Sequence, residues 1–215
     1  MTIRVFLVDD HALVRTGLRM ILSAEDDIEI VGEAESGEEA LPQIRRLKPD
    51  VVLCDLHLPG VSGLEVTERI VRAGHESRVV IVSVLEDGPL PKRLLDAGAS
   101  GYIGKAGDAR ELLRAVREVS RGKRYLGTSI AQNIALASVD GGGSPFDQLS
   151  PRELEVAMLL VQGLRQDAIA KRLSLSAKTV NTHKSRLFEK LDVGDNIALA
   201  RLAARYGLME PTQGL

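Results

Sequence analysis

The sequence lacks several features that mark whole classes of protein. Only one of its 215 residues, Cys54, is a cysteine, which excludes an internal disulfide or a cysteine-rich zinc site and fits a reducing cytoplasm. No apolar run approaches the ~20 residues that a membrane-spanning helix needs, and the stretch from Met1 to Asp10 passes from apolar residues directly into two acids. We therefore expect a cytoplasmic protein with neither a signal peptide nor a membrane anchor.

Positive and negative charges nearly balance over the whole chain, but not along it. The sequence is 44% hydrophobic and 27% charged, with a net charge of −2, a composition that supports a packed core and argues against disorder. Residues 1–122 contain 16 lysines and arginines against 21 acidic residues, a net charge of −5, whereas residues 149–208 contain 10 against 6, a net charge of +4. The length suits one large domain or two small ones, and the opposite charges indicate that only the second part meets a polyanion.

The first 122 residues alternate short apolar runs with longer stretches of helical period. The expected strands are Ile3–Val8, Ile28–Glu33, Val51–Cys54, Val79–Val82 and Gly101–Ile103, and the expected helices are Ala12–Leu22, Gly37–Leu47, Leu64–Arg72, Leu90–Ala97 and Ala109–Arg121. Five βα units in succession predict a doubly wound α/β fold, in which five parallel strands form a sheet covered by helices on both faces. Ligands of such sheets bind at the carboxyl ends of the strands.

Two of these helices carry a start signal, and one carries a breaker. Ser36 with Glu39, and Asp108 with Glu111, have the spacing of capping boxes, in which each side chain satisfies a free backbone N–H group. Pro42 lies inside the second expected helix, where proline removes a hydrogen bond and clashes with the preceding turn. We expect a kink or a late helix start there.

The rest of the chain is helical after a weakly patterned stretch. Residues 140–145 read Asp-Gly-Gly-Gly-Ser-Pro, a linker by composition, with a candidate short helix before it at Ile130–Ala137. Four further helices are expected at Pro151–Gln162, Gln166–Leu173, Ala177–Leu191 and Asn196–Tyr206, the first with a strong start at residues 150–153, Ser-Pro-Arg-Glu. We therefore divide the chain into a first domain at 1–122, a linker at 123–148, an all-α domain at 149–208 and a tail at 209–215.

Acidic residues follow two of the expected strands in the first domain. Asp9 and Asp10 follow the first strand and Asp55 follows the third, so the sheet should bring three carboxylates together. Such a cluster repels itself unless a cation neutralises it, and oxygen ligands that leave room for water suit Mg²⁺. Lys105 and Ser83 follow the fifth and fourth strands at the same rim. A carboxylate nucleophile, a divalent metal, a fixed cation and a hydroxyl are what transfer of a phosphoryl group to an aspartate needs.

Three motifs in this order resemble those of bacterial response-regulator receiver domains: Leu-Val-Asp-Asp-His at 7–11, Asp-Leu-His-Leu-Pro-Gly at 55–60 and Gly-Tyr-Ile-Gly-Lys at 101–105. The resemblance covers residues 1–122 and implies a flavodoxin-like (CheY-like) fold. It also implies that Asp55 is the phosphoacceptor and that Asp9, Asp10 and Asp55 bind Mg²⁺ together with the backbone carbonyl of His57. The imidazoles of His11 and His57 are expected at the surface rather than on the metal.

The same resemblance gives roles to residues of the fourth and fifth strands. Lys105 pairs with the phosphoryl group, Ser83 donates a hydrogen bond to it, and Tyr102 is the aromatic switch that turns inward. On the residues alone, Ser83 could be a small strand-end residue and Tyr102 a half-buried strand aromatic. Members of the family often have proline after the lysine, frequently with a cis peptide, whereas Ala106 stands here, so we expect a trans peptide and a looser following loop.

Residues 166–191 read as a helix-turn-helix. In its last helix Ala177, Val180, Leu187 and Leu191 can face the core, and the opposite face carries Lys178, Asn181, Thr182, Ser185 and Arg186. Cations contact phosphates, and short polar side chains can read base edges in the major groove. An ordinary solvated helix surface is the alternative interpretation of this face.

The second domain closely resembles the LuxR-type DNA-binding domain of the NarL/FixJ regulators. The resemblance spans residues 149–208 and rests on Leu-Ser-Pro-Arg-Glu-Leu at 149–154, Ala-Ile-Ala-Lys-Arg-Leu at 168–173 and Ser-Ala-Lys-Thr-Val at 176–180. It implies DNA contacts from Lys178, Thr179, Asn181, Thr182, Lys184, Ser185 and Arg186, of which Lys184 and Arg186 meet phosphates. Some relatives have lysine where Asn181 and Ser185 stand, so base preference should differ, and His183 is expected on the DNA face or packed on the scaffold.

By the same resemblance the last helix, Asn196–Tyr206, supplies a dimer seam. The candidates are Ile197, Leu199, Ala200, Leu202 and Ala203, and the alternative is packing onto the domain's own core.

Together the two domains resemble a two-component response regulator of the GacA/UvrY type within the NarL/FixJ group. This resemblance implies phosphorylation by a sensor histidine kinase or a small phosphodonor, followed by binding of an active homodimer to double-stranded promoter DNA, and no enzymatic turnover. One alternative is a phosphatase or phosphotransferase of the haloacid-dehalogenase type, but those enzymes have a second aspartate two residues after the first, where this chain has His57. The other is a phosphorylation-independent DNA-binding regulator whose first domain serves only for dimerisation or ligand binding.

Overall fold

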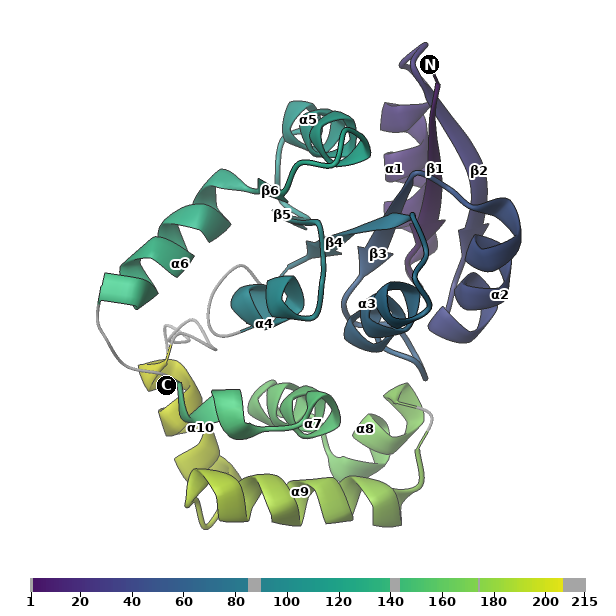
Figure 1. The fold of residues 1–215 in the computed structure, drawn as a ribbon. Coiled ribbons are helices and arrows are strands. Elements are labelled where there is room, and N and C mark those ends of the chain that lie inside the picture. Colours follow the sequence, from purple (N-terminus) through teal and green to yellow (C-terminus); the bar gives the residue numbers. More distant parts are fainter. Residues whose placement is uncertain (1, 85–89, 140–143, 174, 207–215) are drawn as a thin grey trace. The chain divides into compact units, whose positions relative to one another are not determined.

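The computed structural model describes residues 2–84, 90–139, 144–173 and 175–206 (Figure 1). The chain forms two compact units. The first comprises residues 1–86 and 91–135, and the second comprises residues 87–90 and 136–215.

The first unit is built on one parallel sheet of six strands in the order β2-β1-β3-β4-β5-β6. The strands are β1 (Ile3–Val8), β2 (Ile28–Ala34), β3 (Val51–Asp55), β4 (Arg78–Ser83), β5 (Gly101–Gly104) and β6 (Tyr125–Leu126). Its helices are α1 (Ala12–Leu22), α2 (Gly37–Leu47), α3 (Gly63–Arg72), α4 (Leu90–Asp96), α5 (Ala109–Ser120) and α6 (Thr128–Val139), of which α6 ends in the second unit. The predicted doubly wound α/β fold is confirmed.

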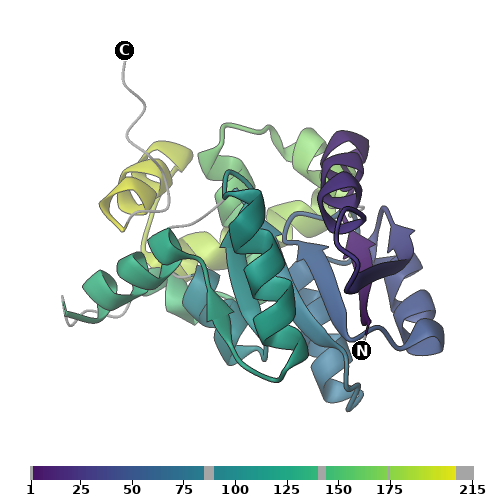
Figure 2. The same cartoon turned by 90° about the horizontal axis from the view of Figure 1, so that it is seen from above.

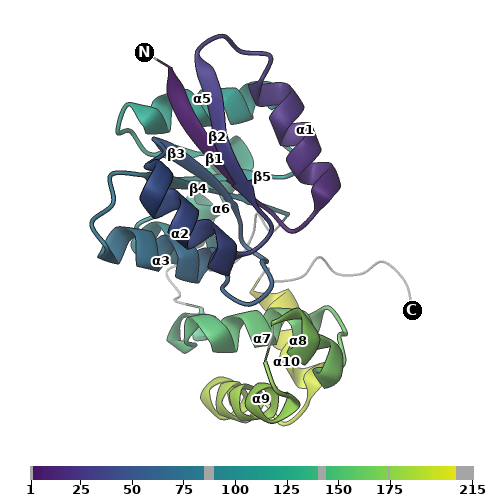
Figure 3. The same cartoon turned by 90° about the vertical axis from the view of Figure 1, so that its right-hand side faces the viewer.

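Helices cover both faces of this sheet because the strands are apolar on both sides (Figure 3). Alternate strand residues such as Leu7 and Leu53 pack with Leu22 of α1 and with Leu112 and Val116 of α5. α2 and α3 cover the opposite face (Figure 3), where α2 contacts β1, β2 and α3. The side chains packed between the sheet and these helices are thus apolar, and the polar residues singled out above lie at the strand ends.

The structure differs from the sequence-based expectations in the strand count and at the caps. Tyr125 and Leu126 pair with β5 and add a sixth strand, inside the segment expected to be a linker, and α6 follows it beyond the sheet edge (Figure 2). Glu39 accepts from the backbone N–H of Glu35 instead of Ser36. Glu111 accepts from the backbone N–H of Thr128, at the start of α6, instead of Asp108. The Ser36–Glu39 box is therefore half formed, because only the Ser36 hydroxyl takes its expected N–H group. The Asp108–Glu111 box is not formed, because Asp108 caps its helix through the backbone N–H of Arg110 instead of Glu111.

Pro42 does not delay the start of α2. The helix begins at Gly37, capped by the Ser36 hydroxyl, which accepts from the backbone N–H of Glu39 at 3.3 Å. It runs through Pro42 to Leu47, so the cap outweighs the one hydrogen bond that the proline removes. The expected late start is wrong, and a kink stays a prediction.

The second unit contains a short 3₁₀ helix, η1 (Pro145–Gln148), and the helices α7 (Pro151–Val161), α8 (Gln166–Arg172), α9 (Ala177–Leu191) and α10 (Asn196–Arg205). The expected capping box at its first helix is present, because Ser150 and Glu153 exchange hydrogen bonds through their side chains and backbone N–H groups. Lys190 Nζ lies 2.6 Å from Glu153 Oε2 and ties the end of α9 to the start of α7. In the described part of the chain, no helix is both long and apolar enough to cross a membrane.

Candidate functional site

The carboxyl ends of the central strands carry the polar residues that the sequence singled out. Asp9 and Asp10 directly follow β1, and Asp55 is the last residue of β3, whose residue Cys54 pairs with Val8 of β1. One ligand atom each of Asp9, Asp10, His11 and Asp55 lies within 4.8 Å of the others. Asp9 and Asp55 are buried, with side-chain exposures of 2% and 3%. The three predicted carboxylates therefore do meet, and His11 joins them.

Lys105 neutralises part of this negative charge. Its Nζ lies 2.8 Å from Asp9 Oδ2 and 2.9 Å from Asp55 Oδ2. Burial alone would lower the pKa of Lys105, but hydrogen bonds and charges from Asp9 and Asp55 outweigh that effect and raise it. The ammonium group is therefore a fixed cation between two buried carboxylates.

Ser83 lies beside Lys105 at the same strand ends. Asp55 pairs with Val82 in the β3–β4 register, and Ser83 pairs with Gly104 in the β4–β5 register. The backbone N–H of Lys105 donates to the carbonyl of Ser83 at 2.7 Å, and Ser83 is fully buried. Three adjacent strands thus present an acid, a hydroxyl and an ammonium group at one rim.

The cluster has oxygen atoms suited to a hard cation. Asp9 Oδ2 and Asp10 Oδ1 are shielded from solvent. Lys105 Nζ contacts Asp9 Oδ2 as an ion pair, and His11 Nδ1 lies 2.8 Å from Asp10 Oδ1, where it is a cation only when protonated. One ammonium group cannot balance three carboxylates, and buried negative charge is costly unless a cation binds it, so Asp9, Asp10 and Asp55 fit a divalent metal.

Arg15 holds the Asp9–Asp10 turn, a role that sequence reasoning missed. Its Nη1 donates to the carbonyl of Asp9 at 2.6 Å, and its Nη2 contacts Glu35. The arginine is 9% exposed and shares the buried side of α1 with Leu22, seven residues later. A charged residue at an apolar helix position was the available signal, because buried arginines are rare unless they are paired.

The loop after Asp55 is fixed by close backbone packing. The backbone N–H of Gly63 donates to the carbonyl of Leu56 at 3.0 Å, and a Cβ atom at Gly63 would lie 2.1 Å from the carbonyl oxygen of Asp55. The carboxylate of Glu38 accepts from the backbone N–H of Val61 at 3.0 Å and ties the loop to the start of α2. Only glycine fits at 63, so α3 starts directly against the backbone that carries Asp55.

The remaining predicted residues of this rim are located as follows. Tyr102 is fully buried rather than half-buried. His57 is half-buried, whereas the ring of His11 is 55% exposed. None of the described peptide bonds is cis, as expected for Ala106. Cys54 is buried, and burial, with the charges of nearby carboxylates, raises the pKa of its thiol.

The outer face of α9 in the second unit is polar and basic. Lys178, Asn181, Thr182, Ser185 and Arg186 are all exposed, as expected. On the inner side of the helix Val180, Leu187 and Leu191 are buried, but Ala177 is exposed, contrary to expectation. Ala177 is the first residue of the helix, where its carbonyl accepts from the Gln166 side chain at 2.9 Å instead of its methyl group entering the core.

Two residues near this face, Thr179 and Lys184, have partners within the unit, and His183 is half-buried. Thr179 is half-buried, and its hydroxyl lies 2.8 Å from that of Ser176. Lys184 Nζ lies 5.1 Å from the centre of the Phe188 ring. His183 is half-buried, and burial lowers its pKa below the usual value, which fits packing on the scaffold.

The last helix divides its apolar residues between two surroundings. Leu199 and Ala203 are fully buried, whereas Ile197 is 66% exposed. Ala200 and Leu202 are half-buried. Part of the proposed seam therefore packs in the core, and Ile197 is left on the surface.

Comparison with known families assigns a family to each part of the chain. A family profile described as the response regulator receiver domain matches residues 5–117, and one described as bacterial regulatory proteins of the luxR family matches residues 147–203. The chain is a response regulator.

Relatives match this response regulator over nearly its whole length. It is 46% identical to the response regulator GacA of Pseudomonas viridiflava over 210 residues, which cover 97% of this chain and 98% of that protein. It is 41% identical to the response regulator UvrY of Escherichia coli K12 over 208 residues, or 96% of this chain and 95% of that protein.

Solved structures give the same assignment. One is RcsB from Salmonella enterica serovar Typhimurium bound to the promoter P1flhDC in the presence of the phosphomimetic BeF3⁻. It is 26% identical with a TM-score of 0.70, over 95% of this response regulator and all of that chain. Another is a LuxR-family response regulator from Aurantimonas, 36% identical with a TM-score of 0.62 over 65% of this chain and 99% of that one.

Proposed function

We propose that Asp55 is the phosphoacceptor of this response regulator and that its phosphorylation depends on Mg²⁺. The observation that carries the proposal is the convergence of three carboxylates, two of them with an oxygen shielded from solvent, around one lysine. Asp9, Asp10 and Asp55 would hold the ion together with the backbone carbonyl of His57. Bound Mg²⁺ supplies positive charge that stabilises the transferring phosphoryl group.

The chain's own groups divide the remaining work. A carboxylate oxygen of Asp55 attacks phosphorus, a P–O or P–N bond of the donor breaks, and the donor keeps the electron pair and takes up a proton. Lys105, now paired with Asp55 Oδ2 at 2.9 Å, would pair with the added phosphoryl oxygens. The Ser83 hydroxyl would donate a hydrogen bond to the same group, and the buried ring of Tyr102 would respond as the switch.

A phosphorylation assay tests this assignment. Mg²⁺ with a small phosphodonor such as acetyl phosphate should add about 80 Da, one phosphoryl group, to the wild-type chain. The variant Asp55→Asn should gain no mass. The control variant Asp50→Asn changes the acid that directly precedes β3, at the opposite end of the strand from Asp55, and should still be modified. Modification of Asp55→Asn, or modification without Mg²⁺, would contradict the proposal.

We propose further that the exposed face of α9 binds promoter DNA. Lys178, Asn181, Thr182 and Ser185 would face the groove, with Arg186 on a phosphate. Thr179 and Lys184 have the partners described above and would have to leave them to reach DNA.

The salt dependence of DNA binding tests the role of α9. Lys178→Ala should weaken binding and reduce the slope of affinity against salt concentration by about one released counterion. Arg46→Ala, which removes a charge from the other unit, is the matched control. An unaltered slope for Lys178→Ala would remove this lysine from the interface.

The domain limits and partners are proposals of the same kind. We place the receiver domain at 1–122, the linker at 123–148, the DNA-binding domain at 149–208 and the tail at 209–215, in a protein that works in the cytoplasm. A sensor histidine kinase would meet the exposed apolar residues of α1, Leu13 and Met20, which are 85% and 71% exposed.

Activated chains would pair as a homodimer on a twofold DNA site. DNA affinity that does not change when Asp55 is phosphorylated would favour the alternative regulator, in which the first domain serves only for dimerisation or ligand binding.

A further inference from the structure

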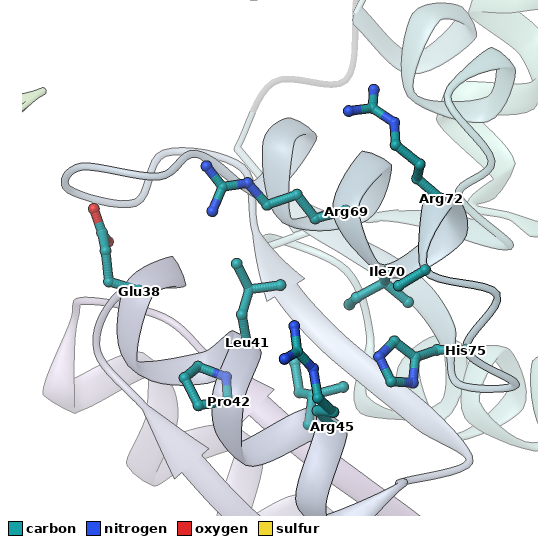
Figure 4. Close-up of a pocket in the computed structure, with 10 residues that line it drawn as sticks. Glu38, Leu41, Pro42, Arg45, Arg69, Ile70, Arg72 and His75 are labelled. Carbon is teal, nitrogen blue, oxygen red and sulfur yellow. The ribbon is translucent and has the colours of Figure 1, made fainter.

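A groove of about 570 Å³ lies between α2 and α3, apart from the site described above (Figure 4). Its floor is apolar and consists of Leu41, Pro42, Ile44 and Ile70. Its lining shares no residue with the Asp9–Asp10–Asp55 cluster. The volume falls within the range of about 300–1,000 Å³ that is typical of small-molecule sites.

The rim of this groove is strongly basic. Arg45, Arg69, Arg72 and His75 line it with a single acid, Glu38, and Figure 4 shows Leu41 and Ile70 between the arginines. The Glu38 carboxylate is already engaged by the backbone of the β3–α3 loop.

Two of these arginines, Arg45 and Arg72, have no acidic side chain beside them among the described residues. Arg69 pairs with Glu65 at 2.6 Å, but among the described residues neither Arg45 nor Arg72 has an acidic partner within ion-pair distance. Both lie in the last turns of their helices, where cations interact favourably with the helix dipole. That interaction accounts for a cation at each helix end, and both arginines also line this one groove.

We propose that this groove binds a small organic anion with a planar apolar body. The apolar side chains would remove the body from water, while a guanidinium group at the rim, that of Arg45 or of Arg72, would bind a phosphate, sulfonate or carboxylate group through paired N–H donors. An uncharged molecule of the same shape would keep the apolar contacts but lose the interaction with the arginine side chains. The site is independent of the proposed phosphorylation, because none of its lining residues takes part in it.

A fluorescent anion of this type, 8-anilinonaphthalene-1-sulfonate, tests the proposal on the full-length protein. The wild type should bind it, and the double variant Arg45→Gln/Arg72→Gln should bind about fivefold more weakly or worse, if each lost charge pair contributes roughly 0.5 kcal/mol. Arg46→Gln is the matched control, since Arg46 is the exposed neighbour of Arg45 on α2 and does not line the groove. Uncharged N-phenyl-1-naphthylamine should not distinguish the double variant from the wild type.

Amide chemical shifts identify the site of binding. The sulfonate should shift the amides of α2 and α3 in the wild type, and unchanged melting temperatures of the variants establish that they are folded. The proposal is overturned if the wild type does not bind the sulfonate or if the shifts lie elsewhere. It is equally overturned if the double variant binds as the wild type does or if Arg46→Gln weakens binding to the same extent.

Discussion

Replacing Gly63 with alanine should disturb Asp55, the proposed phosphoacceptor, from a distance of eight residues. The new Cβ atom would lie 2.1 Å from the carbonyl oxygen of Asp55 and 2.9 Å from its carbonyl carbon. These are backbone atoms, so they cannot rotate away. Restoring even a tight contact of about 3 Å requires a shift of about 1 Å between α3 and the end of β3, and displacements of that size can cost about 100-fold in rate. Overpacking should also lower the free energy of unfolding by about 1–3 kcal/mol.

The experiment compares two glycine-to-alanine variants. Gly17 lies inside α1, where an added Cβ meets nothing within 4 Å, so Gly17→Ala should keep the wild-type rate and gain up to about 1 kcal/mol of stability. The rate is followed by intact mass during treatment with Mg²⁺ and acetyl phosphate, and the stability by thermal melting. If Gly63→Ala is phosphorylated as fast as the wild type and melts no lower, the close approach does not position Asp55.

Three further variants test the side-chain contacts of Arg15, Glu153 and Glu111. Arg15→Gln should lower the free energy of unfolding by about 1–3 kcal/mol, because the buried carbonyl of Asp9 loses its donor, and should raise the Mg²⁺ concentration for half-maximal phosphorylation; an unchanged Mg²⁺ requirement would argue against a positioning role. Burial alone would raise the pKa of Glu153, but Lys190 and the cap hold it below 4.5. The carboxylate therefore stabilises the fold above about pH 4.5 and loses this effect as the pH falls through the lowered pKa. Glu153→Gln should reduce the melting temperature at pH 7 and less so at pH 3, and equal losses at both would refute this. Glu111→Ala should remove about 0.5–2 kcal/mol of capping from α6 and speed amide hydrogen exchange in its first turn, whereas wild-type exchange would show that the cap is dispensable.

Local signals were enough to predict most helices and strands of the receiver and of the helix-turn-helix. α1, α2 and α9 have the predicted limits, because each has helical periodicity, and α2 and α9 also begin at a serine cap that acts within a few residues. The Ser150–Glu153 capping box is of this kind. The acidic rim was also predictable, because parallel strands place the residues after them at one edge regardless of how the helices pack.

Contacts between distant segments were not predictable in the same way. β6 is only two residues long, too short to give an apolar alternation, and it exists because β5 offers a free edge. Glu111 has the spacing of a capping box, but its carboxylate reaches Thr128, 17 residues later. Arg15 looked like one more helix cation until the structure paired it with Glu35, 20 residues later. In each case the partner is set by tertiary packing rather than by neighbours in the sequence.

The helix that follows β6 shortens the tether between the two folded units. Stretched out completely, the 18 residues from 127 to 144, between β6 and η1, could reach about 60 Å. Twelve of them are wound into α6, where they cover about 18 Å instead of about 40 Å. A shorter tether confines each unit to a smaller volume around the other and so raises the effective concentration of one unit for the other. Melting α6 would lengthen it without breaking a covalent bond.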